Sequence, residues 1–227
     1  MLKPEHRAKL IDQHWRLNNL YYIKDKNGKT VKFKMTSEQL HYFNNIHNRN
    51  IILKARQLGF TTEVCIIQLD SALFESATCA LIAHTKPDAQ RLFRNKVRFA
   101  YNKLPDTIKN ANPLVIENTD EIVFTKGGSV TVSTSFRGGT VQWLHVSEFG
   151  KICAKQPEKA REIVTGAFEA VPINGKITLE STAEGRQGYF FDYSQQAEKD
   201  QLANKELTAQ DWRFFFFSWW QNPEYSM

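Results

Sequence analysis

Polar and apolar residues alternate along the chain in patterns that predict an ordered series of helices and strands. Near the N-terminus, apolar residues at helical spacing predict a helix over residues 3–20. The segment 21–34 then predicts a hairpin, because it contains the Asn-Gly dipeptide favoured in two-residue turns. Thr36 or Ser37 is a suitable capping residue for a short helix that ends near His47.

Beyond this point, short apolar runs alternate with longer amphipathic segments. The apolar runs predict strands at 50–55, 78–84, 141–148, 176–182 and 211–220, and a hairpin at 120–135. The amphipathic segments predict helices at 61–75, 85–105, 157–171 and 188–207. This alternation is typical of an α/β fold whose mainly parallel sheet is covered by helices on both faces. The last strand is so apolar that we do not expect it at a solvated edge of the sheet.

The chain contains no internal repeat and no low-complexity linker. We therefore expect one domain over residues 36–227, with residues 1–35 as an N-terminal appendage. A chain of 227 residues is long enough for a single α/β domain with a substantial core.

The composition is that of a globular protein, with 41% hydrophobic and 24% charged residues. The apolar runs are far shorter than the roughly 18 residues of a spanning helix, and the first ten residues lack a secretory apolar core. We therefore expect a cytoplasmic protein without membrane contacts. Three cysteines and six histidines lack the spacing of a disulfide framework or a zinc site, so we expect no structural metal. A net charge of +6 is compatible with binding nucleic acid.

The stretch KARQLGFTT, residues 54–62, approaches the phosphate-binding loop pattern G-x-x-x-x-G-K-[ST]. Gly59 and Thr61 match the pattern, but Phe60 takes the place of its lysine, and Lys54 stands five residues before the glycine. Between a strand and a helix, backbone N–H groups of such a loop can bind an anion, and the Thr61 hydroxyl can bind Mg²⁺. Phe60 cannot neutralise charge, and we expect it to pack beneath the loop. An ordinary strand–helix turn explains the same residues equally well.

Two more predicted strands end in polar residues. VQWLHVSE ends in Ser147 and Glu148, where a Walker B strand would carry two acids. Glu148 can polarise a water molecule, whereas Ser147 brings no charge to a Mg²⁺ ion; alternatively, Glu148 simply ends the strand. The strand at 176–182 runs into LESTAEG, residues 179–185. Because ligands of an open α/β sheet lie beyond the carboxyl ends of its strands, these ends together predict one crevice.

Two isolated residues are further candidates. Gln39 lies upstream of the loop, and its amide can both donate to and accept from an adenine edge. Arg137, in the glycine-rich segment SFRGGT, can reach the phosphates of a neighbouring subunit or DNA. A surface glutamine and a solvated hairpin arginine are the alternative interpretations.

The order of these features strongly resembles the ATPase domain of the large terminase subunit of tailed bacteriophages. It runs from Gln39 through LKARQLGFTT and RGGTVQWLHVSE to ESTAEG, and the resemblance extends from about Phe33 to the C-terminus. It implies a RecA-like P-loop NTPase fold and ATP hydrolysis that powers packaging of double-stranded viral DNA into a procapsid. The family's loop commonly reads R-Q-x-G-K-[ST]-T. A variant with an early lysine and an aromatic residue after the glycine matches Lys54 and Phe60.

The resemblance also implies roles by position. Gln39 would contact adenine, and Lys54 would reach the β- and γ-phosphates, with Arg56 as a second candidate for that charge. Glu148 would be the catalytic carboxylate and would hold Mg²⁺ together with Thr61 and Ser147. The other ATP-binding residues of the loop would be Ala55, Gln57, Leu58, Gly59, Phe60 and Thr62. The motif that couples loss of the γ-phosphate to DNA movement would be Ser181, Thr182, Ala183, Glu184 and Gly185.

The implied cofactors are ATP and Mg²⁺, and the implied partners are double-stranded DNA, the portal protein, the small terminase subunit and further copies in a ring. An isolated domain can be monomeric. The family's C-terminal nuclease domain has no counterpart before the chain stops at SWWQNPEYSM, so we expect the ATPase half without nuclease activity. Ser147 and Phe60 leave open a catalytically weak or inactive nucleotide- or DNA-binding module. Another RecA-like DNA motor, such as a helicase, is a further alternative.

Overall fold

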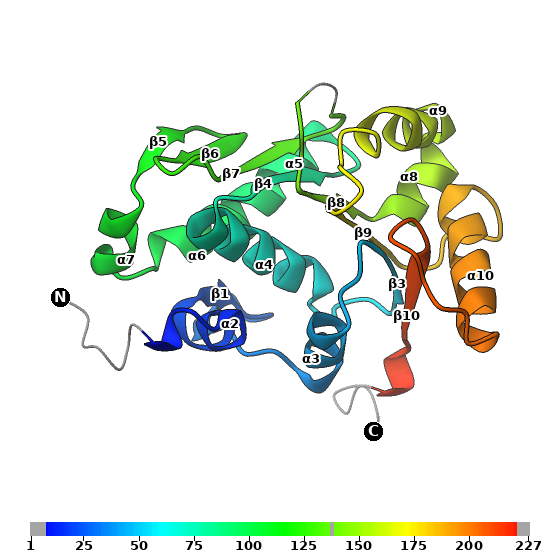
Figure 1. Ribbon diagram of the computed structural model, residues 1–227, viewed down its shortest axis with the longest axis horizontal. Coiled ribbons are helices and arrows are strands. Elements are labelled where there is room, and N and C mark those ends of the chain that lie inside the picture. The colour runs from blue at the N-terminus through cyan, green and yellow to red at the C-terminus, as the bar shows by residue number, and fades with distance from the viewer. Residues whose placement is uncertain (1–7, 137–138, 222–227) are drawn as a thin grey trace.

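A central sheet organises the computed structural model, which describes residues 8–136 and 139–221. Within these residues the sheet has eight strands in the order β10-β3-β9-β8-β4-β7-β6-β5 (Figure 1). Neighbouring strands from β10 to β7 pair in parallel, whereas β6 pairs antiparallel with both β7 and β5. The predicted α/β fold with a mainly parallel sheet is therefore confirmed.

The strands and helices follow the predicted order. The strands of the central sheet are β3 (Arg49–Lys54), β4 (Thr78–Ile82), β5 (Leu114–Glu117), β6 (Glu121–Phe124), β7 (Ser129–Ser133), β8 (Trp143–Ser147), β9 (Lys176–Ser181) and β10 (Trp212–Phe217). The predicted N-terminal hairpin is β1 (Tyr22–Lys24) and β2 (Thr30–Lys32), which pair antiparallel. The α-helices are α2 (Gln13–Leu20), α3 (Ser37–Asn44), α4 (Phe60–Glu75), α5 (Lys86–Leu92), α6 (Phe99–Asn102), α7 (Asp106–Ala111), α8 (Phe149–Lys155), α9 (Pro157–Glu162) and α10 (Tyr189–Leu202).

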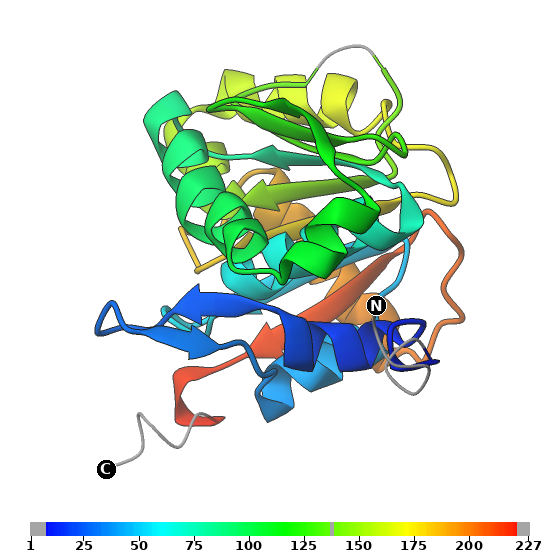
Figure 2. The ribbon, with the colours of Figure 1, turned by 90° about the vertical axis from the view of Figure 1, so that its left-hand side faces the viewer.

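Both faces of the sheet are covered by helices (Figures 1 and 2). Successive residues of β3 point to opposite faces, because side chains alternate along a strand. Ile52 packs in a core cluster with residues of α4, whereas Ile51 packs in a second cluster with residues of α8, α9 and α10. The sheet is therefore buried on both sides, which explains why its inner strands are nearly continuous apolar runs.

Several helices differ from the predicted lengths. Residues 3–7 of the helix predicted at 3–20 lie outside the described residues, and the described part is interrupted at residues 10–12. There the Arg16 guanidinium donates to the carbonyls of Leu10 and Ile11, which a continuous helix would pair with its own N–H groups. The helix predicted at 85–105 begins at its Thr85 cap but passes through a π-helical segment, Phe93–Arg98, before α6. Three elements, β5, α7 and α8, were not predicted. β5 is short and largely exposed, and α8 follows its strand without a polar linker. α7 follows Pro105, where the preceding helix was expected to end.

The position predicted for the last strand is wrong. β10 lies at an edge of the sheet, where it pairs with β3 alone among the described strands. Its apolar character reflects covered side-chain faces rather than a central position: Phe215 and Phe217 are buried, while Phe216 is 48% exposed. The following residues Trp219 and Trp220 are also more than half exposed.

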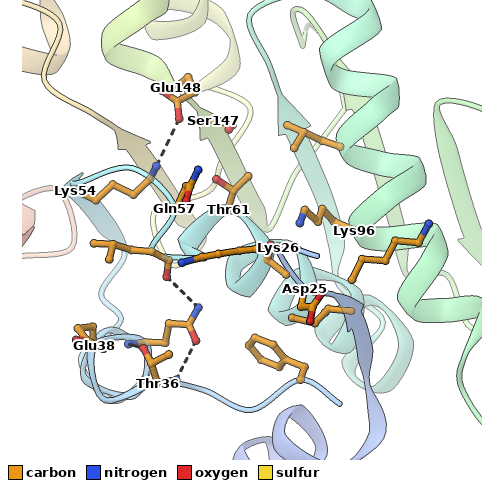
Figure 3. A pocket seen from close by; sticks show the side chains of 18 of the residues that line it. Asp25, Lys26, Thr36, Glu38, Lys54, Gln57, Thr61, Lys96, Ser147 and Glu148 are labelled. Carbon is orange, nitrogen blue, oxygen red and sulfur yellow. Dashed lines mark hydrogen bonds and ion pairs between the residues drawn. The ribbon is translucent and has the colours of Figure 1, made fainter. Parts of the chain in front are cut away.

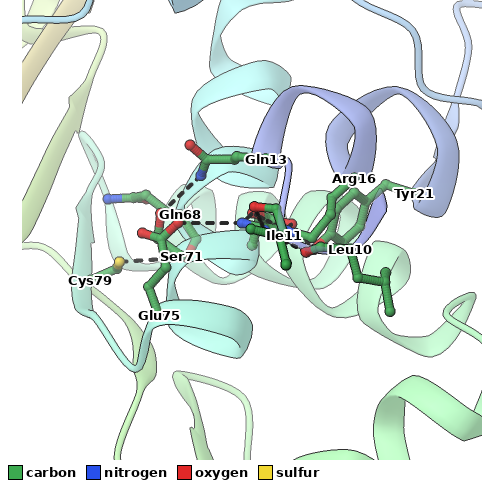
Figure 4. A network of polar contacts seen from close by, with 10 residues as sticks. Leu10, Ile11, Gln13, Arg16, Tyr21, Gln68, Ser71, Glu75 and Cys79 are labelled. Carbon is green, nitrogen blue, oxygen red and sulfur yellow. Dashed lines mark hydrogen bonds and ion pairs between the residues drawn. The ribbon is translucent and has the colours of Figure 1, made fainter. Parts of the chain in front are cut away.

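The N-terminal segment packs directly on the domain. Arg16 of α2 makes a buried ion pair with Asp70 of α4, with 2.6 Å between Nη2 and Oδ2 (Figure 4). The Tyr21 hydroxyl donates a hydrogen bond of 2.7 Å to the same carboxylate. Leu17, Leu20 and Tyr21 belong to the core cluster that contains α4. The helix that follows the glycine loop is thus held by the N-terminal segment as well as by the sheet.

Candidate functional site

A large cavity lies at the carboxyl ends of the central strands. Its volume is about 990 Å³, and its lining includes Lys54 at the end of β3 and Ser147 and Glu148 at the end of β8. Thr61, in the first turn of α4, and Gln57 of the loop line it as well (Figure 3). The predicted crevice is present at the ends of β3 and β8, but none of the residues 179–185 lines it. On its far side, the cavity is bounded by the β1–β2 hairpin, through Ile23, Lys24, Asp25, Lys26 and Asn27.

The loop between β3 and α4 is built around two left-handed residues. Gln57 has φ +61° and Gly59 has φ +79°. These left-handed backbone conformations are sterically unfavourable for a residue with a side chain but not for glycine. The loop ends at Gly59, which is the N-cap of this 16-residue helix, and Gly59, Thr61 and Thr62 at the helix N-terminus line the cavity. Such a terminus carries partial positive charge and suits a phosphate.

Phe60 lies beneath the loop, as predicted. Its side chain is fully buried and is not among the residues that line the cavity. The ring stacks on Phe217 of β10 with 4.4 Å between centroids, and it meets the Tyr42 ring edge-on at 6.2 Å. The residue in the usual lysine position is thus part of the core.

Lys54 supplies a cation to the cavity from the other end of the loop. Its Nζ lies 3.5 Å from Glu148 Oε1 (Figure 3). The same nitrogen lies 2.9 Å from Glu180 Oε2. Burial alone would lower the pKa of Lys54, but Glu180 and Glu148 outweigh that effect and raise it. The lysine is therefore charged at neutral pH and is held at the end of β3 by two carboxylates.

Glu180 is the buried centre of the site, and the sequence interpretation missed it. Its side chain has no exposed surface, and its Oε1 accepts hydrogen bonds of 2.7 Å from both Thr61 Oγ1 and Ser147 Oγ. His145 Nε2 lies 3.5 Å from the same oxygen. Burial would raise the pKa of Glu180, yet Lys54 and these neighbours hold it well below its usual range. A lone acid inside the apolar strand KITLES was the available signal, because charged residues are rarely fully buried unless paired.

Glu148 is the more accessible of the two acids. It occupies the junction between β8 and α8 with φ +55°, a strained conformation for a residue with a side chain. Its side chain is 38% exposed. Burial and the neighbouring Glu180 raise the pKa of Glu148, and Lys54 partly opposes them. A cavity-facing carboxylate with a raised pKa is suited to accept a proton.

Gln39 contacts the loop rather than projecting freely. The residue is buried, and its side chain and that of Thr36 form a reciprocal capping box at the start of α3. Its Nε2 donates to the Leu58 carbonyl at 3.5 Å, and a Cβ on Gly59 would lie 2.8 Å from the same nitrogen. Gln39 therefore lines the cavity beside the loop. A side chain at position 59 would have to displace the Gln39 amide and adopt φ +79°, and the second requirement favours glycine.

The remaining predicted residues are distributed around this centre. Arg56 is exposed and does not line the cavity, whereas Leu58 and Thr62 line it. Ser181 is buried at the end of β9, and residues 182–185 form the irregular segment that follows. None of the residues 181–185 is among those that line the cavity. Arg137 lies outside the described residues.

The donor set fits a Mg²⁺ ion bound together with phosphates. In residues 8–136 and 139–221, no group of three or more His, Cys, Asp or Glu side chains is arranged to hold a metal alone. A nucleotide-associated Mg²⁺ needs only one or two protein oxygen ligands, because phosphates and water supply the others. The hydroxyls of Thr61 and Ser147, together with the Glu180 carboxylate that binds both, are hard oxygen donors of this kind. Across the described part of the chain, no helix has both the length and the apolar character to cross a membrane.

Comparison with solved structures identifies the fold. The ATPase domain of the large terminase from Thermus phage P74-26 matches with a TM-score of 0.59 in a mutant form, over 83% of both chains at 14% identity. The chain has the fold of a large-terminase ATPase domain. The N-terminal domain of the DNA packaging ATPase of bacteriophage phi29 matches with a TM-score of 0.50 at 11% identity, over 80% of this chain and 95% of that one.

A third terminase-like neighbour was solved with a nucleotide analogue. The large terminase of a thermophilic bacteriophage, in complex with ATP-γ-S, matches with a TM-score of 0.50 at 14% identity. The match covers 85% of this chain but 47% of that longer chain. No protein-family model and no curated protein matches the sequence. The terminase-like fold expected from the loop and strand motifs is thus confirmed by structure, at low sequence identity.

Proposed function

We propose that the cavity binds ATP and hydrolyses it to ADP and phosphate, and that the chain is the ATPase part of a phage DNA-packaging motor. One observation carries the proposal. Lys54, Glu148, Thr61 and Ser147 come from separate parts of the sequence and meet at one end of a cavity that begins at the N-terminus of α4. The terminase-like fold supports the same conclusion.

Each residue has a role that its position supports. The α4 N-terminus and the loop N–H groups bind the phosphates, and Lys54 neutralises charge on the β- and γ-phosphates. Glu148 orients a water molecule and accepts its proton as the water oxygen bonds to the γ-phosphorus. The bond from that phosphorus to the bridging oxygen breaks, and ADP leaves. When bound, Mg²⁺ would neutralise phosphate charge, and the hydroxyls of Thr61 and Ser147 would hold it.

Lys54 must exchange partners when nucleotide binds. In the structure its ammonium is paired with Glu180 and Glu148. A γ-phosphate that attracts this ammonium weakens its pairing with Glu148, which then becomes available to water. The proposed ATP-binding set is completed by residues that line the cavity, namely Gln39, Gln57, Leu58, Gly59, Thr61 and Thr62. Ala55, Arg56 and Phe60 of the expected loop set do not line it. Residues 181–185 are the proposed coupling segment.

The proposed output of hydrolysis is movement of double-stranded DNA. The support is the fold, which the chain shares with the phi29 packaging ATPase domain, and the net charge of +6. Within this proposal, the chain works at the portal of a procapsid in the host cytoplasm, as a ring of copies, with a small subunit that selects the DNA. Stimulation of phosphate release by double-stranded DNA is the expected biochemical sign.

Phosphate release by the variant Glu148→Gln tests the proposed catalytic role. The change preserves shape at a side chain that is partly exposed, so we expect the fold to be retained. Loss of a general base typically lowers turnover by about 10²–10⁴-fold. We expect that loss together with retained binding of a fluorescent ATP analogue. Lys54→Ala is expected to lose both turnover and affinity.

The matched control is Glu169→Gln. Glu169 is exposed and interacts electrostatically with Arg49, at the opposite end of β3 from the cavity. This variant should hydrolyse ATP like the wild type. Undiminished turnover in Glu148→Gln would refute the catalytic assignment. Nucleotide binding without phosphate release in the wild type would instead indicate a non-hydrolysing module.

A further inference from the structure

A buried carboxylate stands beside the place where a Walker B acid is missing. Ser147 ends β8 at that position, and it is directly paired with Glu180 in the parallel register of β8 and β9. The Ser147 hydroxyl donates to Glu180 Oε1 over 2.7 Å. A single hydrogen bond between the neighbouring strands β8 and β9 therefore connects Ser147 to the Glu180 carboxylate.

The same oxygen also orients the hydroxyl of the first helical turn. Thr61 Oγ1 donates to Glu180 Oε1 over 2.7 Å, so this oxygen receives both hydroxyls that the site offers to a metal. Lys54 Nζ lies beside the second oxygen at 2.9 Å. Glu180 is fully buried, and these two hydroxyls and the lysine are partners that its two carboxylate oxygens find inside the protein.

We propose that Glu180 supplies the negative charge of the Mg²⁺ site in place of the serine at position 147. The proposal rests on the ATPase function proposed above and adds a residue to it. Glu180 is a positioning residue: it orients the hydroxyls of Thr61 and Ser147 and provides the fixed charge that attracts the cation. Lys54 holds this charge in the absence of ligand and moves toward the phosphates when nucleotide and Mg²⁺ arrive. In this arrangement the acid stands on β9 rather than on the neighbouring strand β8.

The test measures Mg²⁺-dependent nucleotide affinity rather than turnover. A fluorescent ATP analogue is titrated in EDTA and at increasing Mg²⁺ concentrations. In the wild type we expect Mg²⁺ to tighten binding. In Glu180→Gln we expect the Mg²⁺ concentration for half of this effect to rise about 10–100-fold, the range typical for loss of a residue that orients metal ligands. Binding in EDTA should persist.

A double-mutant cycle separates this role from a structural one. Ser147→Asp alone places two carboxylates at paired positions, which should weaken Mg²⁺ coupling or folding because like charges repel. Ser147→Asp combined with Glu180→Gln restores one acid at the usual Walker B position. We expect the double variant to recover the Mg²⁺ response to within about threefold of the wild type, better than either single variant.

Asp70→Asn is the matched control, because Asp70 is also buried and paired with a cation but lies away from the cavity. It should lose stability yet keep the Mg²⁺ dependence. If Glu180→Gln weakens binding equally in EDTA and in Mg²⁺, and the double variant brings no recovery, Glu180 only anchors Lys54 and the inference is wrong. If the wild type binds no nucleotide at all, the proposed ATPase function fails, and this inference fails with it.

Discussion

Replacing Phe60 by lysine would restore the usual sequence of a phosphate-binding loop, and we expect it to damage the protein. The Phe60 ring is fully buried between Phe217 and Tyr42. If the new lysine turns toward the cavity, it leaves a hole equivalent to a Phe→Ala change, which costs about 3–5 kcal/mol. If it stays inside, its methylene groups refill the space, but its ammonium must be neutralised.

The second case can be worked out from titration. A lysine with an ordinary pKa near 10.4 that becomes neutral at pH 7 costs about 4–5 kcal/mol, at roughly 1.4 kcal/mol per pH unit. Both orientations therefore predict a loss of at least about 3 kcal/mol. A domain stability of about 5–15 kcal/mol would be reduced by about a fifth or more.

Urea unfolding followed by far-UV circular dichroism measures this loss. Phe216→Lys is the control, because Phe216 lies next to Phe217 in the same strand but is 48% exposed. The control should cost about 1 kcal/mol or less. A Phe60→Lys protein within about 1 kcal/mol of the wild type would refute the conclusion that Phe60 acts through the core.

Two further predictions concern buried acids of α4. Glu63 is fully buried, neither carboxylate oxygen has a hydrogen-bond partner among the described residues, and burial raises its pKa well above the ordinary value of 4.5. Because the pKa is raised in the folded state, the wild type loses stability as the pH rises above 4.5. The stability of Glu63→Gln relative to the wild type should therefore increase by about 1.4 kcal/mol per pH unit above 4.5, until the folded-state pKa is reached. Urea unfolding across pH 5–8 measures this difference, and a stability difference that does not change with pH would contradict the prediction. Asp70→Asn leaves Arg16 without its buried partner and should cost about 3–5 kcal/mol of stability in the same assay. Glu75→Gln, which changes the half-exposed partner of Arg16, should cost under about 1 kcal/mol. Equal losses would contradict the conclusion that Asp70 is the main partner of Arg16.

Local patterns predicted the buried strands of the sheet well because their faces are covered, whereas the short and largely exposed β5 was missed. The runs NIILKA, TCALIAH and KITLEST are apolar on both sides, and β3, β4 and β9 follow them closely. The apolar pattern could not predict the position of β10 in the sheet. Apolar side chains indicate that the faces of a strand are covered by helices and loops, but not whether the strand pairs with a neighbour on each side. Its neighbour is decided by long-range packing, such as the stack of Phe217 on Phe60.

The candidate site was predictable where a sequence motif specifies functional residue types at a defined spacing. Lys54, Thr61, Ser147 and Glu148 all line the predicted crevice for that reason. Glu180 was missed because its importance comes from the register between β8 and β9, which no local pattern contains. The part played by the N-terminal hairpin in the cavity wall was missed for the same reason, since residues 23 and 57 are distant in sequence.

The hairpin wall has a thermodynamic consequence. Lys24 and Lys26 line the cavity from β1 and its turn, while the neighbouring helix α2 is fixed to α4 through Arg16 and Asp70. If bound nucleotide favours one hairpin position by some factor, a neighbouring molecule that holds the hairpin in that position must raise nucleotide affinity by the same factor. Under that condition, a contact made outside the cavity would set how tightly the cavity holds its ligand.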